Sequence, residues 1–185
     1  MADDFRAELY DPEAWAKLFE RSGAKYIVLT SKHHDGFALW PSKEASAVWG
    51  FPWNAAEAGP KRDLLGDLFR AVRKTSVHAG MYYSLYEWFN PLWKADEEKY
   101  RDQHVWPQMK ELINTYEPDV FWTDGDWEVS DEVWHSKQFI AWMYNESPVK
   151  DRVVTYDRWG SNVRFHHGSV SEQGEWDGGS RQLSV

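Results

Sequence analysis

The stretch KYIVLTSKHHDGF, residues 25–37, joins an apolar run to a polar cluster. Its first part, Lys25 to Thr30, is rich in β-branched and apolar residues and predicts a buried β-strand. The strand is followed closely by His33, His34 and Asp35, whose side chains can bind a ligand or take part in catalysis. The stretch therefore predicts a strand that brings polar side chains to one end of a sheet.

A helix followed by a strand occurs four times along the chain. The helices are expected between Pro12 and Gly23 and at residues 63–74, 97–116 and 131–145, and the strands at residues 25–30, 77–85, 119–123 and 152–156. Residues 42–60 and 87–96 are expected to be loops. Strands that alternate with helices favour a parallel sheet, either doubly wound or closed into a (β/α) barrel.

The composition is that of a globular chain, since hydrophobic residues make up 42% and charged residues 28% of the 185 residues. The formal net charge of -9 disfavours nucleic acid as a partner, because an acidic surface repels phosphates. No run approaches the roughly 20 apolar residues of a membrane helix, so no membrane partner is expected. No signal peptide is visible, and the absence of cysteine rules out disulfides and cysteine-ligated metals.

Each expected strand is followed by a cluster of polar and aromatic residues. The clusters are Lys32–Gly36, Tyr82–Trp88, Trp122–Glu128 and Tyr156–Gly160. In parallel α/β folds the carboxyl ends of the strands share one face, and active sites lie there. The chain also has 13 tryptophans, whose flat rings suit the apolar faces of sugars. These features together predict a carbohydrate site at that face.

Three of the candidate groups leave alternatives open. His33 and His34 suit a polyol ligand, but they could also form a metal pair or include one core histidine, and adjacent residues of a strand point to opposite faces. Asp124 suits a nucleophile or a general base, because it follows a buried strand and is held rigidly. Arg158 could pair with Asp124 or Asp157, or bind a substrate oxygen.

Four segments resemble the α-L-fucosidases of glycoside hydrolase family 29, of the animal, lysosomal type. They are KYIVLTSKHHDGFALWPS, GMYYSLYEWFNPLW, YEPDVFWTDGDWE and SPVKDRVVTYDRWG. The resemblance extends from about Leu9 to Gly168. It implies an α/β fold that is part of a (β/α) TIM-type barrel, with about four of its strands present, and retaining hydrolysis of terminal α-L-fucose.

The resemblance also implies roles for individual residues. Asp124 would be the catalytic nucleophile. The residues expected to bind the sugar are His33, His34, Trp40, Tyr83 and Arg158. Tyr83 is chosen for this role over its neighbour Tyr82. No cofactor and no metal ion is implied.

The domain division expected from the resemblance has two parts. Residues 1–170 would form the partial catalytic barrel, and residues 171–185 would form an irregular tail unlike the family. Family members carry their general acid/base glutamate beyond the region that this chain resembles. Glu172 and Glu175, which lie in the tail, are not assigned that role. Glu87 and Glu128 are the other glutamates near strand ends.

The expected function is removal of terminal fucose from glycans or glycoproteins, weak or absent in this chain because the acid/base region is missing. One alternative is a fucose-binding module without catalysis. Another is an interaction fragment that associates with a second copy or with the full-length enzyme, and a third is a metal-dependent hydrolase. The resemblance implies a lysosomal or secreted protein, and Asn145-Glu146-Ser147 is an N-glycosylation sequon.

Overall fold

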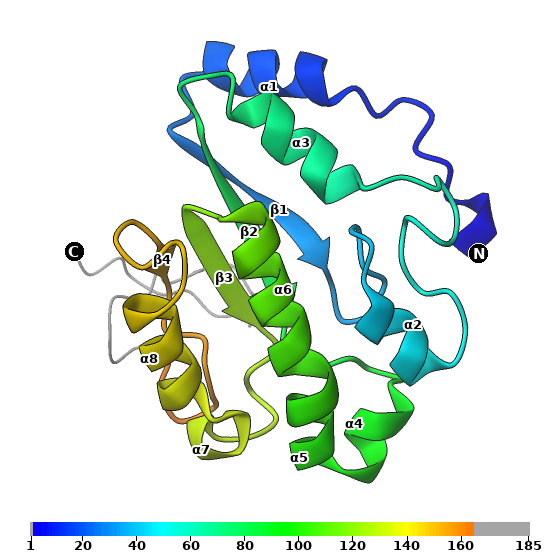
Figure 1. Cartoon of the computed structure of the whole chain (residues 1–185), viewed down its shortest axis with the longest axis vertical. Coiled ribbons are helices and arrows are strands. Elements are labelled where there is room, and N and C mark those ends of the chain that lie inside the picture. Colours follow the sequence, from blue (N-terminus) through cyan, green and yellow to red (C-terminus); the bar gives the residue numbers. More distant parts are fainter. Residues whose placement is uncertain (1, 165–185) are drawn as a thin grey trace, which may run out of the picture.

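A computed structural model describes residues 2–164, which form an α/β fold around one sheet (Figure 1). The strands are β1 (Tyr26–Lys32), β2 (His78–Ser84), β3 (Val120–Asp124) and β4 (Val154–Thr155). Neighbouring strands are parallel and lie in the order β1-β2-β3-β4. Their spatial order therefore equals their order in the sequence, as helical crossovers between parallel neighbours produce.

Helices connect the strands. The longer ones are α1 (Pro12–Arg21), α3 (Leu64–Val72), α6 (Trp106–Tyr116) and α8 (Ser136–Asn145). The shorter ones are η1 (Ala2–Asp4), α2 (Lys43–Trp49), α4 (Pro91–Ala95), α5 (Glu97–Tyr100), the π-helical η2 (Arg101–Val105) and α7 (Asp131–Trp134). In Figure 1, α1 and α3 lie side by side, and α6 crosses in front of β2 and β3. Within residues 2–164, no helix has the length and apolar character needed to span a membrane.

The two expected loops contain short helices that the sequence analysis missed. Residues 42–60 include α2, which begins after Ser42, whose Oγ accepts a hydrogen bond from the backbone N–H of Ala45. Residues 87–96 include α4, whose first turn is capped in the same way by Asn90. Both caps satisfy backbone donors at a helix start and so stabilise helices of only one or two turns.

Two of the expected long helices are interrupted, and the last strand is shorter than expected. The helix expected at 97–116 passes through η2 before Pro107, which has no N–H to continue the regular hydrogen-bond pattern. The helix expected at 131–145 breaks at His135, whose φ of 52° is left-handed. The strand expected at 152–156 is reduced to the two residues of β4.

Side chains alternate between the two faces of β2 and β3, which separates the core from the site. Met81 and Phe121 are opposite each other in the ladder and are fully buried in the core. Tyr82 and Trp122 are the next pair, and they line a pocket on the other face together with Asp124. One face of the sheet therefore packs against the helices, and the other carries polar groups.

A bulge near the end of β1 changes the direction of the residues that follow. Thr30 is opposite Tyr82 but Lys32 is opposite Tyr83, so Ser31 is an extra residue in the ladder. Ser31 and Lys32 are both fully buried. Bulges re-aim side chains at strand ends. This one lies directly before the two histidines.

The core position of α3 can be tested with a matched pair of leucines. Leu65 on α3 has no exposed surface, whereas Leu18 on α1 is 58% exposed. Leu65→Ala leaves a cavity, so we expect it to lower the free energy of unfolding by about 2–5 kcal/mol. Leu18→Ala should change it by no more than about 0.5 kcal/mol. Urea denaturation followed by tryptophan fluorescence measures both, and equal losses would contradict this packing.

Candidate active site

A pocket of about 320 Å³ opens on the face of the sheet opposite the core. It is lined by Val28, Thr30, His33, Tyr82, Trp122, Asp124 and Arg158. These residues come from β1, β2, β3 and the segments that follow β1 and β4. Three of the predicted site residues, His33, Asp124 and Arg158, are therefore brought together.

Asp124 is the last residue of β3 and is held by two donors. The hydroxyl of Tyr82 donates to Oδ2 at 2.8 Å, and Nη1 of Arg158 donates to Oδ1 at 2.7 Å. Burial raises the pKa of the Asp124 carboxyl, but the hydrogen bonds from Arg158 and Tyr82 and the Arg158 charge outweigh burial and lower the pKa below its ordinary value. The carboxylate is therefore ionised at neutral pH and fixed in one orientation, as a nucleophile requires.

The position of Arg158 is also fixed by its backbone. Thr123 lies on the core side of β3, and its hydroxyl donates to the carbonyl oxygen of Arg158 at 2.5 Å. Of the alternatives considered for Arg158, the ion pair with Asp124 is present. The last two residues of β3, Thr123 and Asp124, thus hold Arg158 beside the carboxylate.

His34 lies beside Asp124, and the opposite nitrogen of its ring contacts Ser84. Its Nε2 is 4.0 Å from Oδ2 of Asp124, and its Nδ1 is 2.6 Å from Oγ of Ser84. The Ser84 hydroxyl donates to the carbonyl oxygen of Tyr86 at 2.5 Å. Burial, followed by the neighbouring His33, lowers the pKa of His34 to about 4. The ring is therefore neutral at pH 7.

His33 and His34 were expected to point to opposite faces, as adjacent residues of a strand do. The structure instead places both rings on the same side of the sheet. β1 ends at Lys32, so the pair lies in the turn after the strand, and the ring centroids are 4.0 Å apart. The ring of His33 also stacks on that of Tyr82, at 5.5 Å between centroids. Both histidines therefore lie on the Asp124 side of the sheet. In the part of the chain that the structure describes, no group of three or more His, Asp or Glu residues is placed to hold a metal ion.

Partly exposed aromatic rings surround the histidine pair. The centroids of Trp88 and Trp127 each lie 5.3 Å from that of His34. Nε1 of Trp88 donates to the hydroxyl of Tyr86 at 2.7 Å, which holds the indole ring in place. Trp88 is 45% and Trp127 37% exposed. Both indole rings are therefore partly accessible, and rings of this type can stack on a sugar.

Trp40 and Tyr83, which were predicted to line the pocket, are instead buried in the core. Nε1 of Trp40 donates to Oε2 of Glu111 at 2.8 Å, and the hydroxyl of Tyr83 donates to Oε1 of Gln108 at 2.7 Å. The physical reason for Tyr83 is the alternation along β2, which directs it to the side opposite Tyr82. The structure thus brings Tyr82 to Asp124 and takes Tyr83 away from it.

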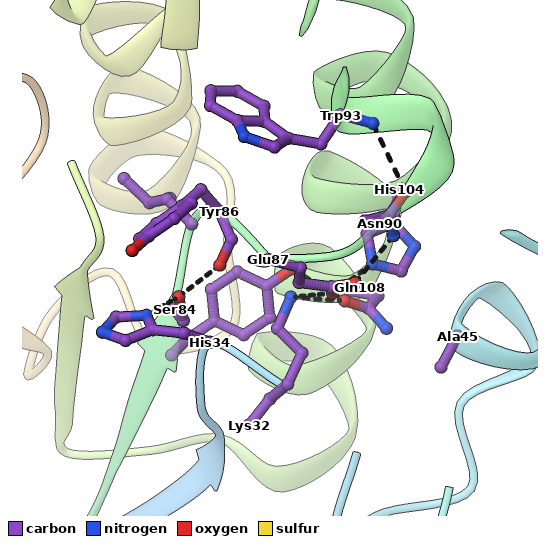
Figure 2. A network of polar contacts seen from close by, with 12 residues as sticks. Lys32, His34, Ala45, Ser84, Tyr86, Glu87, Asn90, Trp93, His104 and Gln108 are labelled. Carbon is purple, nitrogen blue, oxygen red and sulfur yellow. Dashed lines mark hydrogen bonds and ion pairs between the residues drawn. The ribbon is translucent and has the colours of Figure 1, made fainter. Parts of the chain in front are cut away.

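Figure 2 shows a buried polar network beside the site, centred on Lys32 and Glu87. Nζ of Lys32 donates to Oε1 of Glu87 at 2.7 Å and to Oε1 of Gln108 at 3.2 Å. Nε2 of His104 lies 2.6 Å from Oε1 of Glu87, and Nδ2 of Asn90 donates to Oε2 at 2.7 Å. Burial raises the pKa of Glu87, but Lys32 and His104 outweigh it and hold the pKa well below its ordinary value. Glu87 is therefore an ionised structural group, and it holds no proton to donate as a general acid.

The network also fits against the turn that contains the histidines. Gly36 has a φ of 79°, and a Cβ at this position would lie 2.5 Å from Oε2 of Glu87. The backbone N–H of Trp88 donates to the carbonyl oxygen of His34 at 2.8 Å. The turn after β1 and the segment after β2 therefore hold each other in one arrangement.

Four residues of this site were given no role from the sequence. They are Tyr82, Ser84, Asp126 and Arg164. Nη2 of Arg164 lies 3.8 Å from Oδ1 of Asp124, and Nε of Arg164 donates to the buried Asp126 at 3.0 Å. The period of two along β2 is the signal that would have found Tyr82 and Ser84, since residues 82 and 84 share a face. No local pattern indicated the Arg164 contacts.

Comparison with known proteins assigns the chain to a family. A sequence model of the family described as Alpha-L-fucosidase matches residues 1–181. The chain belongs to the alpha-L-fucosidase family. It is 49% identical to the tissue alpha-L-fucosidase of Rattus norvegicus over 173 residues, which is 90% of this chain and 36% of the rat protein. It is 48% identical to the Homo sapiens tissue alpha-L-fucosidase over 170 residues, 89% of this chain and 35% of the human protein.

The fold is similar to that of solved alpha-L-fucosidase structures. That of the Thermotoga maritima alpha-fucosidase with a mechanism based inhibitor superposes with a TM-score of 0.71 at 38% identity, covering 86% of this chain and 38% of that chain. This similarity and the parallel sheet confirm the expected fold class, a partial (β/α) barrel. The chain spans about a third of the length of the curated relatives it matches. The boundary predicted at residue 170 lies outside the described residues and stays a prediction.

The opposite directions of Tyr82 and Tyr83 can be tested by removing each hydroxyl. Tyr82→Phe removes a donor to Asp124, so we expect the pKa of the Asp124 carboxyl to rise. Tyr83→Phe removes a donor to Gln108 in the core and should lower the free energy of unfolding by about 1 kcal/mol, leaving the pKa of Asp124 unchanged. Carboxyl ¹³C NMR over a pH series measures the pKa. A larger shift in the Tyr83 variant would contradict the alternation.

The Lys32–Glu87 pair can be tested against an exposed pair of the same type. Glu87→Gln leaves the buried Lys32 ammonium without a counter-charge, so we expect a loss of about 3–5 kcal/mol in the free energy of unfolding. Glu13 pairs with Lys74 at the surface, and Glu13→Gln should cost less than about 1 kcal/mol. Chemical denaturation at neutral pH measures both. Similar small losses for the two variants would show that the buried pair is not charged.

Proposed function

We propose that this chain forms the fucose-binding and nucleophile-bearing part of a retaining alpha-L-fucosidase. The observation that carries the proposal is the Asp124 carboxylate, which is ionised and held by Tyr82 and Arg158 at the end of β3. His33 lines the same pocket, and His34 lies beside it. Membership of the alpha-L-fucosidase family supports α-L-fucose as the sugar.

In this proposal Asp124 attacks the anomeric carbon of an α-L-fucoside. A bond forms between a carboxylate oxygen and that carbon while the bond to the leaving oxygen breaks, and the leaving oxygen takes the electron pair and then a proton. Water afterwards hydrolyses the fucosyl ester and restores the carboxylate. The donors Tyr82 and Arg158 orient the carboxylate for the attack and stabilise its charge when the sugar departs.

Protonation of the leaving oxygen is the step for which the described residues offer no group. Retaining glycosidases place a second carboxyl about 5–5.5 Å from the nucleophile. Among residues 2–164, no glutamate lines the pocket that contains Asp124. A general acid contributes about 10²–10⁴-fold to the rate. We therefore expect turnover of this chain to be weak, and to favour substrates whose leaving group departs without a proton.

The proposal extends to substrates, location and partners. Fucosylated glycans or glycoproteins are the substrates that family membership supports. A lysosomal or secreted location is supported by the similarity to mammalian tissue alpha-L-fucosidases, and Asn145 of the glycosylation sequon is exposed at the end of α8. β1 and β4 are the outer strands of the sheet, where a second copy or the full-length enzyme would associate.

The test uses an aryl α-L-fucoside, whose leaving group needs little protonation. We expect slow aryl release by the purified chain and a fucosyl adduct detectable by intact mass. Asp124→Asn should lower the release on the order of 10³-fold or more, because the amide is a poor nucleophile. Asp151→Asn changes an exposed aspartate in the same way and should leave the rate unchanged.

Two outcomes would contradict this assignment. Release that persists in the Asp124→Asn variant would mean that another group attacks the sugar. Saturable L-fucose binding that survives Asp124→Asn, with no release by the unmodified chain, would favour a binding module without catalysis.

A further inference from the structure

We propose that Ser84 is a positioning residue that fixes His34 in the tautomer with a proton on Nδ1, leaving Nε2 as a hydrogen-bond acceptor for a sugar hydroxyl. The tautomer follows from the geometry of the protein alone. The identity of the hydroxyl donor rests on the proposed function, because it assumes that a fucosyl residue occupies the pocket.

The direction of each hydrogen bond fixes the proton on His34. The carbonyl oxygen of Tyr86 can only accept, so the hydroxyl of Ser84, 2.5 Å away, must donate to it. A hydroxyl has one hydrogen, so Oγ of Ser84 is left as an acceptor for its second partner. That partner is Nδ1 of His34 at 2.6 Å, which must therefore carry a hydrogen.

The opposite nitrogen of the ring then has a free lone pair while the ring is neutral. Burial and the neighbouring His33 favour the neutral form of His34. Nε2 lies 4.0 Å from Oδ2 of Asp124, beyond hydrogen-bond distance, as expected for two acceptors. A proton on Nε2 would instead be drawn to the carboxylate, and the histidine would then compete with the substrate for Asp124.

The hydrogen-bonded series His34–Ser84–Tyr86 is held rigidly by the fold. Ser84 is fully buried and His34 is 6% exposed. Ser84 is paired with Asp124 in the ladder between β2 and β3. The residue that anchors His34 therefore lies directly beside the proposed nucleophile. Gly125 leaves room for this series, since a Cβ there would lie 2.5 Å from Cδ1 of Tyr86 and 2.9 Å from Oγ of Ser84.

The arrangement gives the pocket a neutral acceptor next to its charged one. Tyr82 and Arg158 donate to Asp124, and the carboxylate is needed for the reacting carbon. A sugar hydroxyl that approaches beside Asp124 can donate its hydrogen to Nε2 of His34 rather than to the nucleophile. The neutral imidazole thus binds the hydroxyl without adding charge beside the carboxylate.

The tautomer is measured directly by NMR of the full chain with ¹⁵N-labelled histidine near neutral pH and without sugar. Correlations between ring hydrogens and nitrogens distinguish a protonated from an unprotonated nitrogen at each position. We expect Nδ1 of His34 to be protonated and Nε2 unprotonated. A His34 ring with its proton on Nε2 would overturn the proposal, whatever the variants show.

Two variants separate positioning from general support of the fold. Ser84→Ala removes the acceptor, so we expect His34 to change to the tautomer with the proton on Nε2. Ser84→Thr keeps a hydroxyl and should keep the original tautomer. The exposed His78 pairs with Asp119 far along the sheet, so its signals should be the same in all three proteins. A His34 tautomer that is unchanged in Ser84→Ala would also overturn the proposal.

Titration with L-fucose tests the functional part separately. We expect Ser84→Ala to weaken fucose binding about tenfold, the loss of one hydrogen bond, and Ser84→Thr to retain it. Equal affinity in the two variants would overturn the acceptor role of Nε2. If the unmodified chain binds no fucose while His34 shows the expected tautomer, the proposed function fails and the role of Ser84 in fixing the ring stands.

Discussion

The buried ion pair between Lys32 and Glu87 joins the ends of β1 and β2, and the geometry of the site depends on it. Removing two charges from water costs several kcal/mol per ion, and only close partners compensate for that cost. Here the carboxylate also has His104 and Asn90 as partners, and both of its oxygens are used. Glu87 lies directly before Trp88, whose backbone binds the histidine turn. The pair therefore helps to determine where the histidines lie, through the segment that contains Glu87 and Trp88.

The second constraint is the alternation of side-chain direction along β2, which places neighbouring residues on opposite faces of the sheet. Tyr83 packs in the core, where its hydroxyl donates to Gln108, whereas the hydroxyl of Tyr82 donates to Asp124 on the other face. Ser84 returns to the site face, opposite Asp124. A shift of one residue in the register of β2 would turn Tyr82 and Ser84 toward the core and Tyr83 toward the site, because every side chain of the strand would change face. The core contacts of Met81 and Tyr83 thus keep the site residues in place.

Much of the fold follows from local sequence, and much of the site does not. The alternation of helices and strands and the polar strand ends follow from apolar runs and their spacing, so Asp124 is found at the end of β3 as expected. The direction of the histidines does not follow, because the bulge at Ser31 and the turn after β1 override the strand pattern. The partners of Glu87 also could not be found, since Lys32 is 55 residues away in the chain. Contacts of that separation depend on the packing of whole elements, which no local pattern records.

The order of the strands explains why so short a segment of the family contains a pocket. In a parallel sheet whose strands follow the sequence, the carboxyl ends of successive strands lie side by side at one edge. The groups around Asp124 therefore come from β2 and from the segments after β1 and β4. The positions next to it are taken by Ser84 and Arg158, neither of which is an acid with a proton to give. A second carboxyl must approach from across the sugar, about 5 Å away. In the proposed reaction, binding and attack would therefore be local to these strands, whereas protonation of the leaving oxygen would depend on a group from the opposite side of the pocket or on solvent.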